Sequence, residues 1–130
     1  MAEPKKAGET FEHARTCEKY TPIYYAAASG DFHPFHVDKE VGDAAGFGGA
    51  ILQNLCTMSW AAEAAVKFLG DPAKLKRLRV RFAKPVRPGD ELTFEGRVTQ
   101  VDRGQLIATM TARNQDGEDV LENVVVEAQD

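Results

Sequence analysis

Two carboxylates and two imidazoles fall within ten consecutive residues, 29–38. Gly30 and Pro34 lie in the same stretch and are typical of a shaped loop rather than the interior of a helix or strand. A carboxylate and an imidazole spaced as Asp31 and His36 are can contact one water molecule, take a proton from it and deliver a proton elsewhere. These residue types indicate general acid–base chemistry on a loop. The alternative is that Asp31 braces a turn and His36 is a structural histidine.

The same loop holds a candidate set of metal ligands. Asp31, His33 and His36 offer one carboxylate and two imidazoles, a donor set that suits several divalent metals. Pro34 restricts how the two imidazoles can approach one ion. We therefore predict that the site holds no metal, and that His33 supports the acid–base pair or forms a wall of the pocket.

Helix signals surround the loop. Thr21 followed by Pro22 predicts a helix start, with Gly30 as the end of that helix. Asp38 predicts the N-cap of a short second helix. After a glycine-rich break, a run without Gly or Pro predicts a long helix of roughly 30 Å, closed by Gly70. The predicted helices span residues 21–28, 38–45 and 50–69.

Apolar residues occupy most of the circumference of the long helix, which predicts burial on nearly all sides. Ser59, Glu63 and Lys67 form its one clear polar stripe, and Glu63 is spaced to pair with Lys67. Gln53 and Asn54 add further polar groups to the run, so a membrane span is not expected.

From Leu75 onward the hydrophobic period changes from helical to two. Leu78, Val80 and Phe82 alternate with arginines, and later segments repeat the alternation between turn residues. The predicted strands cover residues 10–18, 75–82, 92–101, 106–112 and 120–128. One buried helix against one antiparallel sheet is an α+β layer architecture. We expect a single domain over residues 1–130, with residues 1–9 as a loose tail.

The composition is that of a soluble globular protein: of 130 residues, 43% are hydrophobic and 28% are charged, with a formal net charge of -4. An acidic chain with few interleaved aromatic residues argues against nucleic-acid binding. Cys17 and Cys56 lack the spacing of a disulfide framework, and the polar N-terminus lacks the apolar core of a signal peptide. We therefore expect a protein of the reducing cytosol.

The loop of residues 29–38, SGDFHPFHVD, resembles that of the MaoC-like family of (R)-specific enoyl-CoA hydratases and dehydratases, the hydratase 2 group. Similar segments follow at residues 45–48 (AGFG), 55–58 (LCTM) and 81–89 (RFAKPVRPG), and the likeness covers about residues 20–128. The resemblance implies the hot-dog fold, in which a curved antiparallel sheet wraps a long central helix.

The resemblance also implies an activity, the reversible hydration of a trans-2-enoyl thioester to an (R)-3-hydroxyacyl thioester. The acyl carrier is coenzyme A or acyl carrier protein. Asp31 and His36 match the family's acid–base pair, and the backbone amide of Asn54 matches the group that holds charge on the thioester oxygen. The family uses no metal, and its only cofactor is the coenzyme A of the substrate.

Four positions depart from the family's pattern. The family's Asn in the loop is His33 here, its His-Gly at the helix start is Gln53-Asn54, and a small hydroxyl residue further along the helix is Ala62. A backbone N–H survives a change from Gly to Asn, so Asn54, Gln53 and His33 are candidate oxyanion or substrate-binding residues. Alternatively, Gln53 and Asn54 could serve only to form hydrogen bonds with the free backbone groups at the start of the helix. The changed start motivates a second hypothesis, an acyl-thioester-binding subunit without full activity.

Other groups suggest partners. Arg79, Arg81 and Lys84 could contact the phosphates of coenzyme A, although a solvated strand face explains most of this basic band more simply. Glu63 could be the carboxylate of an acyl-CoA thioesterase, as in other hot-dog enzymes, but its pairing with Lys67 is preferred. The sheet leaves a free edge, so we expect a homodimer or a heterodimer with a related chain.

Overall fold

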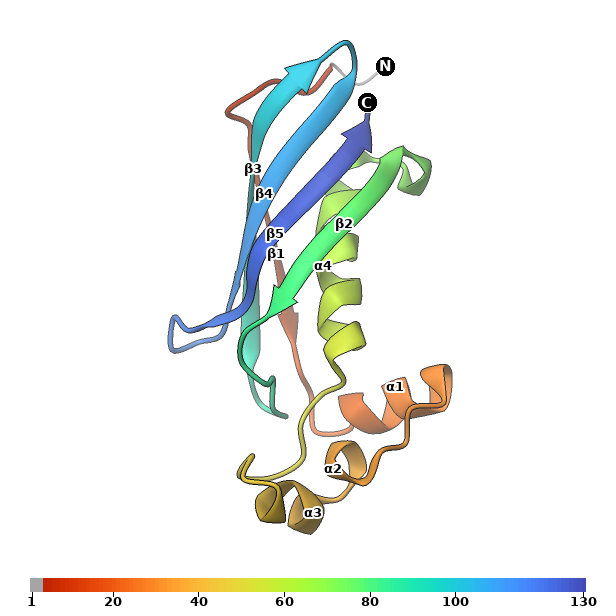
Figure 1. The fold of residues 1–130 in the computed structure, drawn as a ribbon, viewed down its shortest axis with the longest axis vertical. Helices are drawn as coiled ribbons and strands as arrows, with labels where there is room; N and C mark the ends of the chain where they lie inside the picture. The colour runs from red at the N-terminus through yellow and green to blue at the C-terminus, as the bar shows by residue number, and fades with distance from the viewer. Residues whose placement is uncertain (1–3) are drawn as a thin grey trace.

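The computed structural model describes residues 4–130. One five-stranded antiparallel sheet has the order β1-β3-β4-β5-β2, and the long helix α4 lies across one face of it (Figure 1). The strands are β1 (Thr10–Thr16), β2 (Leu75–Phe82), β3 (Glu91–Asp102), β4 (Gln105–Arg113) and β5 (Asp119–Gln129). The helices are α1 (Thr21–Ser29), α2 (Pro34–Val37), α3 (Lys39–Ala44) and α4 (Asn54–Leu69), with a 3₁₀ turn, η1, at Pro72–Lys74. The predicted α+β hot-dog architecture is confirmed.

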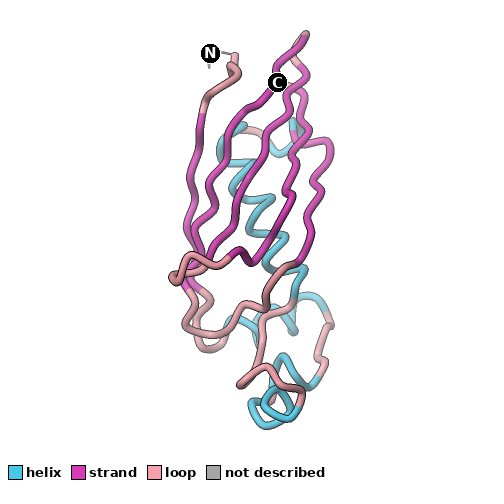
Figure 2. Tube along the Cα trace, turned by 60° about the vertical axis from the view of Figure 1, so that its left-hand side comes forward, coloured by secondary structure: helices cyan, strands magenta, loops and turns pink. Residues whose placement is uncertain are grey.

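Alternation along the strands gives the sheet one apolar face and one polar face. In β3, Leu92, Phe94 and Val98 are buried, whereas Glu95 and Arg97 are exposed. Strands β4 and β5 largely repeat the pattern, so their buried residues join one core cluster with those of α4. Figure 2 shows the strands running past the helix on one side, with the smaller helices gathered at one end of the molecule. All five strand predictions are confirmed, and β1 and β2 form the two edges.

Helix α4 begins at Asn54 and not at Ala50, where the sequence predicts its start. Residues 50–53 lie outside the helix because their backbone groups are needed elsewhere: the Ile51 N–H donates to the carbonyl oxygen of Phe35 at 3.0 Å. No helix within residues 4–130 is long and apolar enough to cross a membrane.

The prediction that α4 is buried on nearly all sides is wrong. Trp60, Ala61 and Ala64 are buried in the core, whereas Leu55 is 62% exposed. A single chain provides one sheet and therefore covers one face of the helix. The opposite face carries a partly exposed apolar stripe made of Leu55, Met58, Ala62 and Val66.

The stretch of residues 29–38 contains a helical turn, α2, where the sequence predicts only a loop. The turn begins with proline, which needs no backbone donor at this position. The Nδ1 atom of His33 accepts the Phe35 N–H at 3.3 Å and caps the turn. The predicted cap of the next helix is confirmed, because the Asp38 carboxylate accepts the Glu40 N–H at 2.9 Å.

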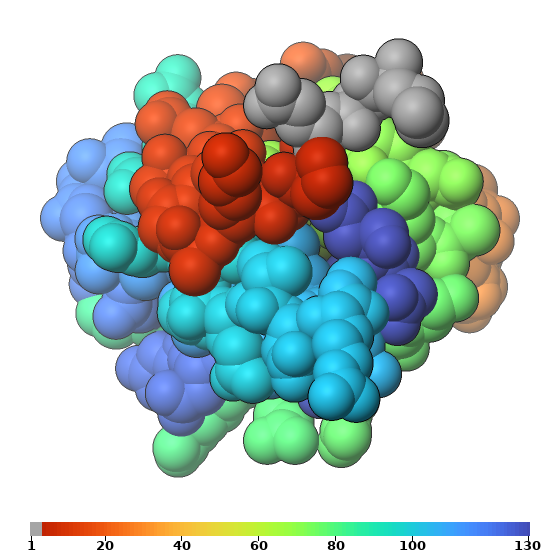
Figure 3. Space-filling view, turned by 90° about the horizontal axis from the view of Figure 1, so that it is seen from above, coloured from red at the N-terminus to blue at the C-terminus, as the bar shows by residue number. Residues whose placement is uncertain are grey.

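The first three residues, part of the predicted loose tail, lie outside the part of the chain that the structure describes. The rest of that tail is bonded to the sheet: the Gly8 N–H donates to the Val98 carbonyl at 2.8 Å, and the Lys5 N–H donates to the Asp130 carboxylate at 2.7 Å. Figure 3 looks onto this end and shows the early residues, in red, against the β3–β4 turn in cyan and the end of β5 in dark blue.

A glycine makes room for the ring that fastens β1 to the helix. Phe11 of β1 faces Gly96 of β3 across the strand pair, and a Cβ atom on Gly96 would lie only 2.0 Å from the Phe11 ring. The Phe11 ring stacks on Phe68 of α4, with ring centroids 4.4 Å apart. The missing side chain therefore lets an edge strand reach the central helix.

Candidate active site

A cavity of about 420 Å³ lies where the loop, the start of α4 and the end of β2 meet. Asp31 and His36, the predicted acid–base pair, both line it. The remaining lining residues, most of them apolar or aromatic, are Phe35, Phe47, Ile51, Asn54, Leu55, Phe82, Ala83, Lys84 and Pro85. A concave, largely apolar space with a few convergent polar groups is typical of a small-molecule site.

The His36 ring is oriented by the backbone of the segment that precedes α4. His36 is 8% exposed, and its Nδ1 atom lies 2.8 Å from the carbonyl oxygen of Ile51. A carbonyl oxygen only accepts hydrogen bonds, so Nδ1 carries the proton and donates it. In the neutral ring Nε2 is therefore the free basic nitrogen. Nε2 lies 3.6 Å from an oxygen of the Asp31 carboxylate.

Asp31 directly follows the C-cap of α1, and the end of that helix positions it at the site. Gly30, with a φ of 81°, adopts the left-handed conformation that closes α1 and turns the chain into the loop. One Asp31 oxygen accepts the His33 N–H at 3.3 Å, and the other lies 3.6 Å from Nε2 of His36. That second distance is too long for a direct hydrogen bond, but one water molecule can contact both groups.

The N-terminus of α4 supplies a third feature of the site. Asn54, the first residue of the helix, lines the cavity. Within residues 4–130, the N–H groups of Asn54 and Leu55 meet no backbone acceptor. Free N–H groups and the positive end of the helix dipole stabilise negative charge. The helix start can therefore stabilise an anion formed beside the loop pair.

Gln53 lies behind the cavity and supports the loop. It is 1% exposed, and its Nε2 donates to the carbonyl oxygens of Pro22 at 2.9 Å and Asp31 at 3.3 Å. Its Oε1 is buried and has no partner among the described residues. The side chain thus ties the start of α1 and the loop to the start of α4, while its predicted role in substrate binding stays a prediction.

His33 stands beside the pair and outside the cavity wall. Its exposed ring packs on Phe35 at a centroid distance of 3.7 Å and meets the His36 ring edge-on at 6.2 Å. Residues 4–130 contain no group of three or more His, Cys, Asp or Glu side chains arranged to hold a metal ion. Metal independence of the activity remains a prediction.

The three predicted phosphate contacts lie in two places. Lys84 lines the cavity and forms an ion pair with Glu118, and the hydrogen bond from Lys84 lowers the pKa of the Glu118 carboxyl. Arg79 and Arg81 are exposed and alternate along β2 with the half-buried Val80. They therefore project from the side of the strand opposite to Val80. Their contact with a substrate stays a prediction.

Glu63 lies outside the cavity and contacts β1. Its carboxylate is 2.5 Å from Nε2 of His13 and 3.4 Å from Arg15. Burial would raise the pKa of Glu63, but the hydrogen bond from His13 and the charges of Arg15 and Lys67 outweigh it, so the pKa is lowered. The predicted pair with Lys67 is therefore not the principal contact, because the strand beside the helix supplies nearer partners.

The two cysteines are unsuited to nucleophilic chemistry. Both are buried and free. Burial raises the pKa of Cys17 to about 12 and that of Cys56 to about 11, so both are thiols at neutral pH.

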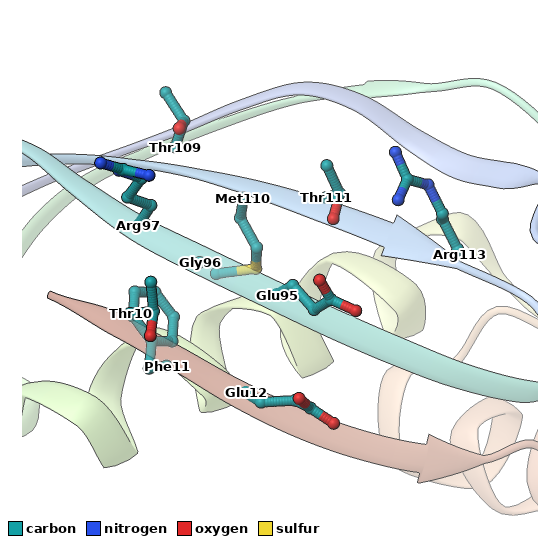
Figure 4. A pocket seen from close by; sticks show the side chains of 10 residues that line it. All are labelled: Thr10, Phe11, Glu12, Glu95, Gly96, Arg97, Thr109, Met110, Thr111 and Arg113. Atoms are coloured by element: carbon teal, nitrogen blue, oxygen red, sulfur yellow. The ribbon is translucent and has the colours of Figure 1, made fainter. Parts of the chain in front are cut away.

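A larger hollow of about 690 Å³ lies on the polar face of the sheet and contains none of the predicted site residues. In Figure 4, Glu95 and Arg97 of β3 and Thr109 of β4 are among the side chains that line it. Arg113, at one end, is paired with Asp119 at 3.0 Å. Charges of both signs alternate here, so no single ligand charge is favoured.

The apolar wall of the active-site cavity is the part that sequence reasoning missed. Phe47, Leu55 and Phe82 come from three separate segments and meet only in the folded chain. All three fall in segments that resemble the family, and that resemblance is the one signal in the sequence that could have marked them.

Comparison with known proteins identifies the family of the chain. Residues 3–119 match the model of the MaoC like domain family. The chain is 35% identical over 101 residues to the mouse "Peroxisomal multifunctional enzyme type 2", which covers 76% of this chain and 13% of the mouse protein. It is 42% identical over 69 residues to "Enoyl-CoA hydratase 2, peroxisomal" of Arabidopsis thaliana, which covers 52% of this chain and 22% of the plant protein. This chain therefore spans a small part of the length of either relative.

A solved structure shows the same fold. The "R-Hydratase PhaJ1 from Pseudomonas aeruginosa in the unliganded form" superposes with a TM-score of 0.87 over 96% of this chain and 81% of that chain, at 23% identity. The family model, the two relatives and the fold confirm the resemblance seen in the loop, and the chain belongs to the MaoC-like domain family.

Proposed function

We propose that this protein catalyses the reversible hydration of a trans-2-enoyl thioester to a 3-hydroxyacyl thioester, as a hydro-lyase. One observation carries the proposal: the Ile51 carbonyl holds the His36 proton on Nδ1 and leaves Nε2 free, 3.6 Å from the Asp31 carboxylate, in a cavity. The name of the Arabidopsis relative supports an enoyl-CoA substrate. The (R) configuration of the product is the expectation from the family resemblance.

The pair acts on one water molecule. Asp31 accepts one hydrogen bond from the water and orients it, while Nε2 of His36 accepts its other proton as the oxygen bonds to the β-carbon. The proton on Nε2 then passes to the α-carbon. The balance is one water added across one double bond, and the reverse sequence removes it.

The start of α4 stabilises the charge that develops between these steps. Attack at the β-carbon moves negative charge onto the thioester oxygen. The free N–H of Asn54 and the positive end of the helix dipole lie at the same cavity and stabilise that oxygen. The Asn54 side chain, which has no counterpart on the family's usual glycine, narrows the space beside this oxygen and influences the choice of acyl chain.

The aromatic and aliphatic wall accommodates the acyl chain, and Lys84 at this wall is a candidate contact for the carrier. Arg79 and Arg81 remain candidates for the phosphates of coenzyme A. No metal and no cofactor beyond the coenzyme A of the substrate is needed for the steps above. A cytosolic location is also proposed, although the names of both relatives place those proteins in peroxisomes.

A second copy of the chain, or a related chain, completes the molecule. Large apolar side chains are exposed: Leu55, which lines the cavity, at 62%, Phe32, next to Asp31 in the loop, at 58%, and Tyr24 of α1 at 70%. β2 has a free edge next to the partly exposed stripe of α4. Pairing two copies through this region would cover both features.

The decisive experiment is a hydration assay with crotonyl-CoA and longer trans-2-enoyl-CoA substrates, following loss of the enone absorbance and resolving the product enantiomers. We expect a 3-hydroxyacyl-CoA product and no release of free thiol. Free thiol without hydration would support the thioesterase alternative. Tight binding with neither reaction would support the acyl-thioester-binding subunit. Both outcomes would overturn the hydratase assignment.

A further inference from the structure

A second cavity, of about 310 Å³, neighbours the active-site cavity. Its lining residues are Lys19, Lys39, Gly48, Gly49, Ala50, Arg87 and Pro88. Two chain segments, residues 47–51 and 82–88, contribute to both cavities. Directly after the first segment, the Leu52 N–H donates to the Val86 carbonyl of the second segment at 2.7 Å. The two cavities share no lining residue, but a ligand in the second cavity would contact the same two segments that line the active-site cavity.

Three cations and no acidic group line this cavity. Within residues 4–130, Lys19, Lys39 and Arg87 form no ion pair with any carboxylate. Lys19 lies 5.3 Å from the centroid of the Tyr20 ring, a contact that does not neutralise its charge. Like charges that lack a carboxylate within ion-pair distance repel one another, so the cavity attracts an anion.

Two glycines bring backbone donors to the same place. Gly48 and Gly49 have φ values of 73° and 130°, which only glycine adopts readily. A Cβ atom on Gly48 would lie 4.0 Å from the Arg87 guanidinium, and one on Gly49 would lie 3.8 Å from the Lys39 side chain. Within residues 4–130, the N–H groups of Gly48, Gly49 and Ala50 donate to no backbone acceptor. Successive free N–H groups beside cations are typical of anion sites.

Helix α3 holds the glycine segment in this shape. A Cβ atom on Gly42 would lie 1.9 Å from the Gly49 carbonyl oxygen, so the two backbones are in direct contact. The Phe47 N–H also donates to the Gly42 carbonyl at 3.0 Å. The donors are therefore positioned before any ligand arrives, which reduces the ordering cost of binding.

We propose that this cavity is a phosphate-binding site. Phosphate oxygens accept hydrogen bonds from guanidinium, ammonium and backbone N–H groups, and residues that carry all three kinds of donor line this cavity. The assignment of the phosphate to the carrier of the acyl thioester rests on the proposed function. A free phosphate-bearing metabolite presents the same chemistry and is the other source of the ligand.

The first arm of the test measures binding and needs no activity. Inorganic pyrophosphate and adenosine 3′,5′-bisphosphate are titrated calorimetrically into the wild-type protein and into the Lys39→Ala/Arg87→Ala double variant. The control is Lys76→Ala/Arg97→Ala, which removes the same two kinds of charge from exposed positions outside both cavities. We expect affinity to fall by about tenfold or more in the first variant and little in the control.

The second arm identifies the source of the phosphate. The KM of an enoyl-CoA is compared with that of the same acyl group on pantetheine, which carries no phosphate. If the carrier supplies the phosphate, Lys39→Ala/Arg87→Ala raises KM for the CoA thioester by about tenfold and leaves the pantetheine thioester and kcat unchanged. Loss of pyrophosphate binding with both KM values unchanged assigns the site to a free metabolite and overturns the carrier assignment.

The remaining outcomes are also decisive. A wild-type protein that binds neither probe, or a control that loses as much affinity as the test variant, overturns the phosphate site. Binding that depends on Lys39 and Arg87 in a protein that hydrates no enoyl thioester supports the site and rejects the proposed function. A thermal melt of each variant shows that the fold is intact.

Discussion

At the scale of single residues, the site depends on which ring nitrogen of His36 carries the proton. The Ile51 carbonyl fixes that proton on Nδ1, so the other nitrogen can accept a proton from water. Asp31 is too distant to bond directly to the ring and is placed to share a water with it. Two ordinary side chains become an acid–base pair because a backbone oxygen from a separate segment orients one of them.

We expect Asp31→Asn and His36→Ala each to lower kcat for enoyl-CoA hydration by about 10²–10⁴-fold, because each removes a group that contacts the reacting water. The double variant should lose little more than either single variant, since the two residues act on one water. Steady-state kinetics of the four proteins checks this.

His13→Ala is the control for the pair, because it removes an imidazole that contacts Glu63 and lies outside the cavity. It should retain most of the activity. Near-wild-type turnover in either Asp31→Asn or His36→Ala would remove the catalytic assignment. Losses that multiply in the double variant would keep both residues but reject a shared water.

The sequence predicts this pair by residue type and spacing, but not its surroundings. Asp31 and His36 lie on one short loop, so local spacing is sufficient to connect them. The Ile51 carbonyl and the amide of Gln53 reach the loop only through tertiary folding. Every residue has a backbone carbonyl, so no residue type in the sequence identifies the one that bonds to His36.

At the scale of elements, the structure differs from the prediction where the backbone of one segment forms hydrogen bonds with another segment. The run from Ala50 to Leu69 has helical composition throughout, but residues 50–53 lie outside the helix. Within them, the Ile51 N–H donates to a carbonyl of α2 and the Leu52 N–H donates to a carbonyl of the loop after β2. Tertiary hydrogen bonds override local propensity there. The strands were easier to predict, because alternation is a local signal that survives folding.

The contact of Phe11 with Gly96 gives a test of how β1 is held. Gly96→Ala should destabilise the fold by about 1–3 kcal/mol, because the added methyl overlaps the Phe11 ring. In a Phe11→Ala background the same substitution should cost little, since the ring is gone. Chemical denaturation of the four proteins measures this. Equal costs in both backgrounds would show that the ring is not the cause.

The Glu63 contact predicts a pH dependence of stability. Its pKa is lowered in the folded state, so the stabilisation is fully present above its ordinary value of 4.5 and is lost as the pH falls through the lowered value. Glu63→Gln should therefore lower the melting temperature at neutral pH, with a cost of about 1 kcal/mol or less.

The gap between wild type and Glu63→Gln should close as the pH drops below 4.5. Melting curves of both proteins across this range check the sign. Lys67→Ala is the control for the helical partner and should change stability less, because His13 and Arg15 make the nearer contacts. A gap that stays constant with pH would reject the charged contact.

At the scale of the whole molecule, one chain leaves its central helix covered on one face. The stripe on α4, the edge of β2 and exposed apolar side chains such as Leu55 are all left uncovered by one chain. A sequence pattern cannot distinguish a helix buried within one chain from a helix buried between two. This explains why the apolar circumference of α4 led to the prediction of complete burial.

We expect the protein to sediment at twice its monomer mass of 14.3 kDa, or to do so once mixed with a related chain. Leu55→Glu should weaken this assembly, because it places a charge on the exposed apolar stripe. Lys67→Glu, on the same helix but already polar, is the control. A wild-type protein that sediments as a monomer at all concentrations, alone and with related chains, would reject the second copy.

The bond between His36 and Ile51 has an evolutionary consequence. The acceptor is a main-chain oxygen, so no exchange of the Ile51 side chain can delete it. The side chain at position 51 can change and so pack against different acyl groups. The proton of His36 stays on Nδ1 through such changes, because its acceptor is the main chain. Substrate preference and proton chemistry can therefore vary independently, although both depend on the same residue.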